Sequence, residues 1–376
     1  METKKYRFDE ATINFDKKRI PLSSAQREKK QGIFRYYGAR GVIDHVDGFI
    51  FDGTYLLIAE DGENLKSKKQ NIAQVVDGQF WVNNHAHIVQ GNEQCDTQFL
   101  CYLINSMDLS GYVTGSAQPK LSQANLNAVT LSLPSVNEQK KIVEYLYMLD
   151  QKIDVNRQIN DNLQQQALAI FQQELLIEGD LPEGWTRSNL LDIANYLNGL
   201  AMQKFRPADG ENGLPVLKIK ELRQGFCDAS SELCSPSIKP EYIVHDGDVI
   251  FSWSGSLLVD LWCGGTCGLN QHLFKVTSEK YPKWFYYIWT AHYLARFIAI
   301  AADKATTMGH IKREELAKAE VVIPDIASME RIGGIMQPIY DLIISNRIEN
   351  RKLSTVRDTL LHQLMSGEID VSDIQL

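Results

Sequence analysis

Apolar residues return at alternating steps of four and three positions in two long stretches of the chain. In the first stretch, positions 142, 146, 149, 153, 156, 160, 163, 167 and 170 read Ile, Leu, Leu, Ile, Asn, Asn, Leu, Ala, Ile. In the second, positions 332, 336, 339, 343, 346, 350, 353, 357 and 360 read Ile, Met, Ile, Ile, Asn, Asn, Leu, Arg, Leu. This heptad seam predicts two long helices, the first over residues 138–175. Gly333, Gly334 and Pro338 predict a kink or a fresh helix start in the second.

Asparagine occupies two successive seam positions in each helix: Asn156 and Asn160 in the first, Asn346 and Asn350 in the second. An amide in an apolar seam costs stability unless it finds a hydrogen-bond partner, and its known use is to fix register. If the two helices are antiparallel, each asparagine pair can meet its counterpart. We therefore expect these four residues to lock one alignment. The alternative is that each helix packs on its own globular domain and leaves its asparagines solvated.

The helices belong to a longer internal repeat. Residues 133–163 and 323–353 align at an offset of 190 without a gap, and seven aligned pairs are identical: Pro134/Pro324, Ile142/Ile332, Ile153/Ile343, Asn156/Asn346, Arg157/Arg347, Asn160/Asn350 and Leu163/Leu353. Upstream, 51–62 resembles 245–256 and 82–89 resembles 269–276 more weakly. A repeat of this length indicates a duplicated domain pair rather than a solenoid.

Short strand-like runs alternate with Gly, Asn and Asp turns in the remaining segments. We therefore predict an α+β protein: two pseudo-repeated α/β domains separated by two long helices packed as an antiparallel coiled coil. The boundaries that follow are 1–133 for the first globular domain, 134–178 for the central helical region, 179–323 for the second globular domain and 324–376 for the C-terminal helical region.

Composition places the chain among globular intracellular proteins. Apolar residues make up 44% of the 376 positions and charged residues 23%, which are ordinary values. No apolar run approaches the roughly 18 residues that a membrane helix needs, and the N-terminus has no apolar signal region. Six cysteines without an export signal favour free thiols in the cytoplasm.

Charge is distributed unevenly along the chain. The net charge is −8, yet residues 1–40 carry eleven Lys or Arg against five acidic residues. A basic patch can attract phosphate although the rest of the surface repels it, because screening limits the reach of each charge. A solvated basic terminus is the alternative reading.

Catalytic motifs are missing from the sequence. It contains no Gly-Lys dipeptide, no His-Glu-x-x-His, no Gly-x-Ser-x-Gly and no Asn/Asp-Pro-Pro-Tyr/Phe run, so common nucleotide, zinc-protease, hydrolase and amino-methyltransferase sites are not indicated. Cys227, Cys234, Cys263 and Cys267 with His272 can be drawn as a zinc site, but their spacing matches common ligand pairs poorly. His85 and His272 share a repeat position, either as satisfied structural histidines or as functional ones.

An ordered set of segments resembles the specificity subunit of type I restriction–modification systems. The segments are 131–154, LPEGW at 181–185, 215–222, 247–256, 311–324 and 360–371, and together they span nearly the whole chain. The first half departs from the pattern because it lacks an LPEGW-type opening and begins instead at the basic segment 18–24.

The resemblance implies a non-catalytic subunit with two target recognition domains, each reading one half of a bipartite site in double-stranded DNA. It implies that the paired helices set the gap between the halves and dock two methyltransferase subunits, with a restriction–translocation subunit as a further candidate partner. S-adenosylmethionine, ATP and magnesium belong to those partners, and no cofactor and no membrane are expected for this chain.

Two small, polar and basic loops precede the matched helical regions, at 115–126 and 304–316. Direct readout of DNA needs Arg or Lys for guanine and Asn or Gln for adenine, and phosphate contacts need cations and hydroxyls. The first candidates for DNA contact are Gln118, Lys120, Lys304, Thr306, Thr307, His310 and Lys312. The second candidates are Tyr36, Tyr37, Arg40, Lys68, Lys69, Asn83, Asn84, Trp253, Ser254, Asn270 and Gln271. Any one of them can instead be an ordinary surface or turn residue.

Two other functions compete with DNA recognition. A non-catalytic coiled-coil scaffold explains the helices but not the duplicated polar loops. A restriction–methylation enzyme with two recognition domains is disfavoured because the motifs for methylation and cleavage are absent.

Overall fold

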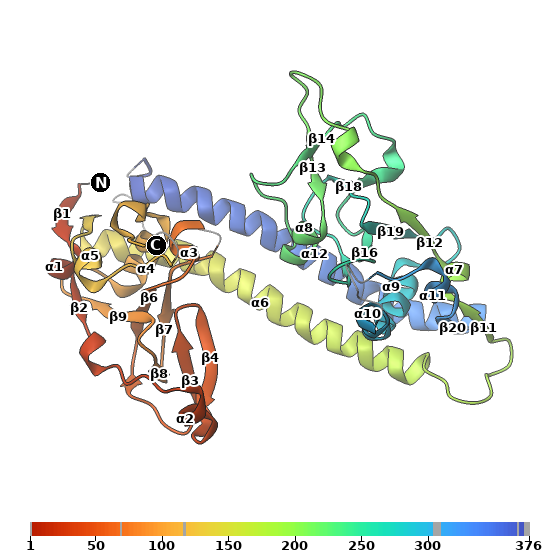
Figure 1. Ribbon diagram of the computed structural model, residues 1–376, viewed down its shortest axis with the longest axis horizontal. Coiled ribbons are helices and arrows are strands. Elements are labelled where there is room, and N and C mark those ends of the chain that lie inside the picture. The colour runs from red at the N-terminus through yellow and green to blue at the C-terminus, as the bar shows by residue number, and fades with distance from the viewer. Residues whose placement is uncertain (1, 68–69, 116–117, 304–309, 367, 372–376) are drawn as a thin grey trace. The chain divides into compact units, whose positions relative to one another are not determined.

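The structure is a computed structural model that describes residues 2–67, 70–115, 118–303, 310–366 and 368–371 (Figure 1). The chain forms two compact units, one of Met1–Gln151 with Ser354–Leu376 and the other of Lys152–Leu353. Each unit therefore combines one globular domain with segments of both long helices. We refer to the globular parts as the first and the second domain.

The first domain contains two four-stranded sheets, with strand orders β2-β9-β6-β7 and β4-β3-β8-β5, and a strand pair β1-β10. Its strands are β1 (Lys4–Arg7), β2 (Thr12–Asn14), β3 (Gln31–Gly38), β4 (Gly41–Val46), β5 (Phe51–Asp52), β6 (Tyr55–Ala59), β7 (Ala73–Val76), β8 (Gln79–Val82), β9 (Ala86–Gly91) and β10 (Thr130–Leu133). Its helices are α1 (Phe8–Ala11), α2 (Ser24–Glu28), α3 (Asn64–Ser67), α4 (Thr97–Ser106) and α5 (Gln123–Asn127).

The second domain repeats this arrangement, with strand orders β12-β19-β16-β17 and β14-β13-β18-β15 and a strand pair β11-β20. Its strands are β11 (Thr186–Asn189), β12 (Asn195–Asn198), β13 (Leu214–Leu217), β14 (Leu233–Cys234), β15 (Ile243–Val244), β16 (Val249–Ser252), β17 (Leu258–Leu261), β18 (Cys267–Leu269), β19 (Leu273–Thr277) and β20 (Glu320–Ile323). Its helices are α7 (Leu190–Ile193), α8 (Ile219–Gln224), α9 (Lys283–His292), α10 (Leu294–Asp303) and α11 (Arg313–Ala317).

The duplication extends to strand direction. The parallel pair β3 and β8 in the first domain has its counterpart in the parallel pair β13 and β18 in the second. All pairings in the β2-β9-β6-β7 sheet and in the β12-β19-β16-β17 sheet are antiparallel. The predicted α+β fold with two repeated domains is thus confirmed.

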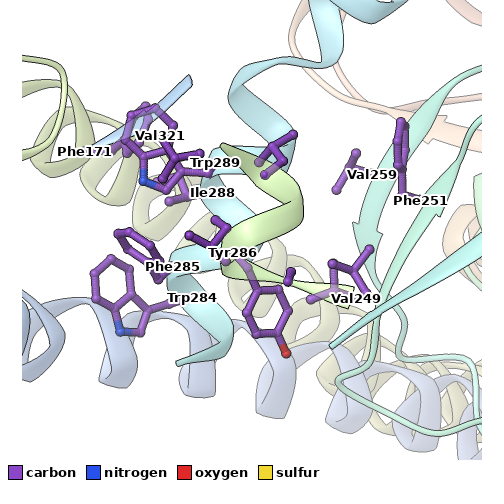
Figure 2. Packing of buried hydrophobic residues seen from close by; sticks show 14 of the residues in the cluster. Phe171, Val249, Phe251, Val259, Trp284, Phe285, Tyr286, Ile288, Trp289 and Val321 are labelled. Atoms are coloured by element: carbon purple, nitrogen blue, oxygen red, sulfur yellow. The ribbon is translucent and has the colours of Figure 1, made fainter. Parts of the chain in front are cut away.

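Two long helices, α6 (Val136–Glu174) and α12 (Ile326–Ser366), supply apolar seams to the cores. In the second unit, Phe171 of α6 packs edge-on against Trp289 of α9, with ring centroids 4.9 Å apart (Figure 2). Ile332 and Met336 of α12 are fully buried in the same cluster. In the first unit, Ile142 and Leu146 of α6 join a core that also includes Leu364 of α12. The seam residues are buried because the helices complete the domain cores as well as packing on each other.

The two helices run antiparallel. Asn156 Nδ2 donates to Asn350 Oδ1 at 2.9 Å, and Asn346 Nδ2 donates to Asn160 Oδ1 at 2.9 Å. Further along, Arg331 donates to Glu174 at 2.6 Å, so rising numbers on α6 meet falling numbers on α12. The four seam asparagines therefore bond to one another in two pairs across the helices, although the buried Oδ1 of Asn156 has no partner. Their role in fixing register stays a prediction.

The expected fresh helix start at Pro338 is wrong, because α12 runs unbroken from Ile326 to Ser366. A proline removes one helical hydrogen bond, and its ring crowds the backbone carbonyl four positions earlier, which is that of Gly334 here. Burial of Met336 and Ile339 in the core offsets the cost of about 3 kcal/mol. Neither this helix nor any other in the described part of the chain has the length and apolar character needed to cross a membrane.

Candidate nucleic-acid interface

The same backbone bonds join three turns at one end of each domain. In the first domain, Leu121 N donates to Glu60 O at 2.8 Å, which ties the loop before α5 to the end of β6. In the second, Ile311 N donates to Trp253 O at 3.1 Å, which ties the loop before α11 to the end of β16. The turns after β8 and β18 are fixed in turn by Asn83 N to Tyr37 O at 2.9 Å and by Asn270 N to Leu217 O at 3.2 Å. Loops far apart in sequence are thereby gathered into one face per domain.

A hollow of about 490 Å³ lies on this face of the first domain. Its lining includes Arg40, Asp61, Asn83, His85 and Gln118. Arg40, Asn83 and Gln118 are among the predicted contacts, so the structure brings together residues from three separate turns. His85 Nδ1 and Asp61 Oδ2 lie 2.6 Å apart and add one acidic and one imidazole group. Basic, amide and acidic groups thus surround one concave surface.

A buried polar network involves residues adjacent in sequence to the lining of the hollow, Glu60 beside Asp61 and Lys120 close to Gln118. His87 lies with Nδ1 2.6 Å from Asp16 Oδ2 and with Nε2 2.8 Å from the carbonyl of Leu121. Each ring nitrogen of His87 therefore lies within hydrogen-bond distance of an oxygen atom. Arg19 joins the network by donating to Glu60 at 2.9 Å, and Lys120 lies 3.2 Å from the other oxygen of Glu60. The network therefore holds the loop at Lys120 and Leu121 to the sheet.

The carboxylates of this network are stabilised in their charged form. Burial alone raises the pKa of Asp16, but hydrogen bonding to His87 and to the Ile88 amide outweighs it and lowers that pKa below its usual value. Burial likewise raises the pKa of Glu60, and Arg19, His87 and Lys120 together lower it. Both groups are therefore ionised at neutral pH.

The corresponding face of the second domain is built around an aromatic side chain. Trp253 Nε1 donates to Asn198 at 2.9 Å, and its ring centroid lies 6.1 Å from that of His272 and 6.3 Å from that of His310. Ser254 pairs with His310 in an isolated bridge, and its hydroxyl lies 3.1 Å from His272 Nδ1. The predicted residues Trp253, Ser254 and His310 therefore come together with His272.

Several predicted residues have structural roles instead. Tyr36 is 0% and Tyr37 4% exposed on β3, a strand flanked by β4 and β8 in its sheet. Their rings are therefore buried in this structure, and their contact with DNA stays a prediction. Asn83 and Asn270 are also buried, and their side-chain oxygens accept from the amides of His85 and Gln271. These asparagines shape the turns rather than present their amides.

Of the other predicted contacts, Asn84 and Lys312 are exposed, and Gln271 is half-buried. Lys68, Lys69, Lys304, Thr306 and Thr307 lie outside the described residues.

Asp61 and the His87 network were missed as candidates, whereas His85 was left open between a structural and a functional role. The shared repeat position of His85 and His272 was the one available signal. The described residues hold no group of three or more His, Cys, Asp and Glu side chains arranged for a metal ion. The alternative zinc site therefore finds no support.

Comparison with known proteins identifies the duplicated unit. The model of the type I restriction modification DNA specificity domain matches residues 9–165 and again 182–355. The type I restriction enzyme MjaIX specificity subunit of Methanocaldococcus jannaschii is 25% identical over 308 residues, 74% of this chain and 70% of that protein. The HindI specificity subunit of Haemophilus influenzae is 21% identical over 408 residues, 85% of this chain and 84% of that protein.

A solved structure shares the fold. The crystal structure of the type I restriction–modification S subunit from M. genitalium superposes with a TM-score of 0.61, at 14% identity and over 97% of this chain and 96% of that one. With two copies of one family domain spanning most of its length, the chain belongs to the family of type I restriction–modification DNA specificity subunits.

Proposed function

We propose that this chain is the DNA-recognition subunit of a type I restriction–modification complex and that each domain reads one half of a bipartite site. The observation that carries the proposal is the duplicated face. The same backbone bonds tie three turns together in each domain, but the side chains on those turns differ. A repeated framework with different polar groups suits a protein that reads two unlike half-sequences.

The exposed groups in the first domain suit base and phosphate contacts. Arg40 and Gln118 line the hollow and are exposed, and such groups form paired hydrogen bonds with guanine and adenine. Asp61 can accept from an exocyclic amino group of cytosine or adenine. Lys120 is half-exposed and suits a phosphate. In the second domain, His310, Gln271 and Lys312 offer the corresponding contacts.

The long helices suit two further tasks. An α6 of 39 residues is about 58 Å long, more than the roughly 34 Å of one DNA turn. We therefore propose that the helix pair sets the gap between half-sites. Tyr147, Met148 and Leu168 on α6 and Leu342 and Val356 on α12 are exposed apolar side chains. We propose that the helices that carry them dock two methyltransferase subunits, with a restriction subunit as an additional partner.

The chemistry of modification belongs to those partners in this proposal. They bind S-adenosylmethionine, and a restriction subunit adds ATP and magnesium, while this chain contributes recognition. The isolated chain mixed with S-adenosylmethionine and DNA is expected to transfer no methyl groups. Transfer without a partner would favour the enzyme alternative instead.

The decisive experiment is co-expression with the methyltransferase encoded nearest to this chain, followed by single-molecule sequencing of host DNA. We expect one split motif with a modified base in each half. Exchange of residues 1–130 for those of a relative should change one half only. A stable complex that leaves no split motif would contradict DNA reading by the two domains and would favour the scaffold alternative.

A further inference from the structure

The segment NRIENR at residues 346–351 carries two kinds of contact on neighbouring faces of α12. Asn346 and Asn350 bond to α6, as described above. Arg347 and Arg351 follow each of them by one position and extend to the second domain. Successive helical residues are about 100° apart around the axis, so one turn of helix can hold a partner helix with one face and a domain with the next.

Each of the two arginines makes a bidentate ion pair with an aspartate side chain. Arg347 donates to the two oxygens of Asp260 on β17 at 2.7 and 2.6 Å. Arg351 donates to the two oxygens of Asp246, in the turn before β16, at 2.7 and 2.8 Å. The side chain of Arg347 is 27% and that of Asp260 21% exposed, and the second pair is similarly shielded. A planar guanidinium matched to a carboxylate fixes direction as well as distance.

The acidic partners are themselves held firmly. Asp246 Oδ1 also accepts from the amide of Gly265 at 2.8 Å, and Arg351 reaches the carbonyl of Cys263. Asp260 is opposite Ile250 in the β16–β17 ladder. Both ion pairs therefore hold the same region around β16, and the partly exposed candidate contact Trp253 follows directly after that strand, next to the buried Ser254. A shift at these ion pairs moves Trp253 with it.

The first copy of the repeat lacks this pair of anchors. Arg157, which aligns with Arg347, is 67% exposed and pairs with Asp154 on its own helix at 3.1 Å. Asp161 stands where Arg351 stands in the second copy. Asp52, in the turn that resembles the one at Asp246, accepts from Gln79 at 2.9 Å. Paired arginine anchors are thus a special feature of the second copy, not a general need of the fold.

We propose that Arg347 and Arg351 are positioning residues that hold the second domain at one place on α12 and so confine the recognised DNA to a single gap length. The inference rests on the proposed function and deepens it. Neighbouring base pairs are about 3.4 Å apart, so discrimination of one gap from the next needs placement tighter than that. Two rigid ion pairs one helical turn apart supply it, since together they resist both sliding and rotation.

The test compares gap lengths in modified DNA. The whole complex with its methyltransferase is co-expressed for the natural chain and for Arg347→Ala/Arg351→Ala, and single-molecule sequencing scores the gap at every modified site. We expect the natural chain to modify one gap length. In the variant we expect both half-sequences to be unchanged, but about one site in ten to have a gap one base pair longer or shorter, as a difference of ~1.4 kcal/mol in binding implies.

Three further variants guard the interpretation. Arg347→Asp combined with Asp260→Arg restores one ion pair with reversed charges and should narrow the gap distribution again. Arg347→Lys/Arg351→Lys keeps the positive charges but removes the planar guanidinium groups that make bidentate pairs. It replaces the alanine variant in the test if the alanine variant forms no complex, and its gap distribution should also broaden. Arg157→Ala removes the aligned arginine of the first copy and should leave a single gap.

The outcomes separate the two proposals. A single unchanged gap in a variant that forms the complex would overturn the positioning role while leaving the proposed function intact. Loss of all modification in both the alanine and the lysine variants, with the complex still formed, would also overturn it, because the pairs would then serve recognition itself. Absence of any split motif with the natural chain would refute the proposed function first.

Discussion

Under their candidate recognition loops, the two domains carry different side chains at three matched places of one framework. The matched residues are Asp16, two positions after β2, and Asn198 at the end of β12; Glu60 and Trp253 after β6 and β16; and His87 and Phe274 in β9 and β19. In the first domain these places form a charged network with Arg19 and Lys120. In the second, Trp253 lies over Phe274 with ring centroids 5.7 Å apart and bonds to Asn198.

The difference teaches that backbone and side chains have separate tasks in this fold. The bonds that gather the turns are made by main-chain groups, which any sequence supplies. The side chains between the turns and the sheet can then be either charged or aromatic, provided that every polar group has a partner and every ring is well packed. An ionic network needs every partner present, whereas an aromatic stack depends mainly on area and fit. The two domains should therefore respond differently to mutation, pH and salt.

The largest effect is expected for His87→Phe, which gives the first domain the side chain of the second. The change leaves the carbonyl of Leu121 without a donor and Asp16 buried with one partner fewer. We expect the free energy of opening in this region to fall by about 3 kcal/mol. Hydrogen exchange at the amides of β2 and β9 measures it. Adding Asp16→Asn, which completes the likeness to the second domain, should recover part of the loss. A loss below about 1 kcal/mol in the single variant would show that the network is dispensable.

In the second domain, the corresponding disruption of the layer under the loops is Trp253→Ala. The indole loses its stacking on Phe274, its contacts with His272 and His310, and its bond to Asn198. Because Trp253 is only partly buried, we expect a loss of about 2 kcal/mol. Exchange at the amides of β16 and β19 reports it. Trp253→Phe is the control, since it keeps a ring and gives up the hydrogen bond alone, for about 1 kcal/mol. Equal losses in the two variants would contradict the view that stacking dominates.

The next largest effect is expected from acid, which should lower the local stability of the first domain more than that of the second. The pKa values of Asp16 and Glu60 are lowered in the folded state. Lowered carboxylate pKa values contribute stability that is present above the unfolded values of about 4 and is lost as pH falls below them. The matched places in the second domain do not titrate in this range. We expect the protection factor of the Ile88 amide, which donates to Asp16 at 2.8 Å, to fall as pH drops below about 4. The amides of β19 should change less, and parallel loss in both strands would contradict the expectation.

Much of the fold follows from periodicity in the sequence. Seam residues such as Ile142 and Ile332 predict the helices because a 3.5-residue repeat has few other solutions, and the offset of 190 predicts the duplicated domain. Asn156 and Asn346 stand out because polar residues are costly in a seam. The helix through Pro338 was not predictable, since its integrity depends on the core against which it packs.

The candidate interface was predictable only in part. Loops carrying Gln118 and His310 stand out by composition and repeat position, and the structure places them on the gathered face. Tyr36 and Tyr37 also suggest an interface, because aromatic residues sit there in a basic segment. Their burial depends on residues distant in sequence or outside their own strand: Arg27 lies over the Tyr36 ring, and Phe80 packs against Tyr37. The network of His87 joins residues more than 30 positions apart, and such contacts leave no local pattern.

The smallest effect sharpens the comparison at the loops themselves. Lys120 and His310 align in the repeat, and each forms a bridge with the turn after β6 or β16. If Lys120 contacts a phosphate, Lys120→Ala should reduce the slope of log affinity against log salt by about 1, uniformly across DNA sequences. Stability should change by less than about 0.5 kcal/mol, because the bond to Glu60 is half-exposed. Binding of the assembled complex to DNA across a salt series measures the slope.

His310→Ala is the matched control for Lys120→Ala in the same complex. If His310 contacts a base and not a phosphate, its removal should weaken binding to the second half-sequence and leave the salt slope unchanged. Lys140→Ala, on the exposed surface of α6, controls for loss of a lysine charge away from the loops. An equal fall in slope for Lys120→Ala and Lys140→Ala would mean that Lys120 acts only through the overall charge of the protein. It would contradict a direct contact between Lys120 and a phosphate.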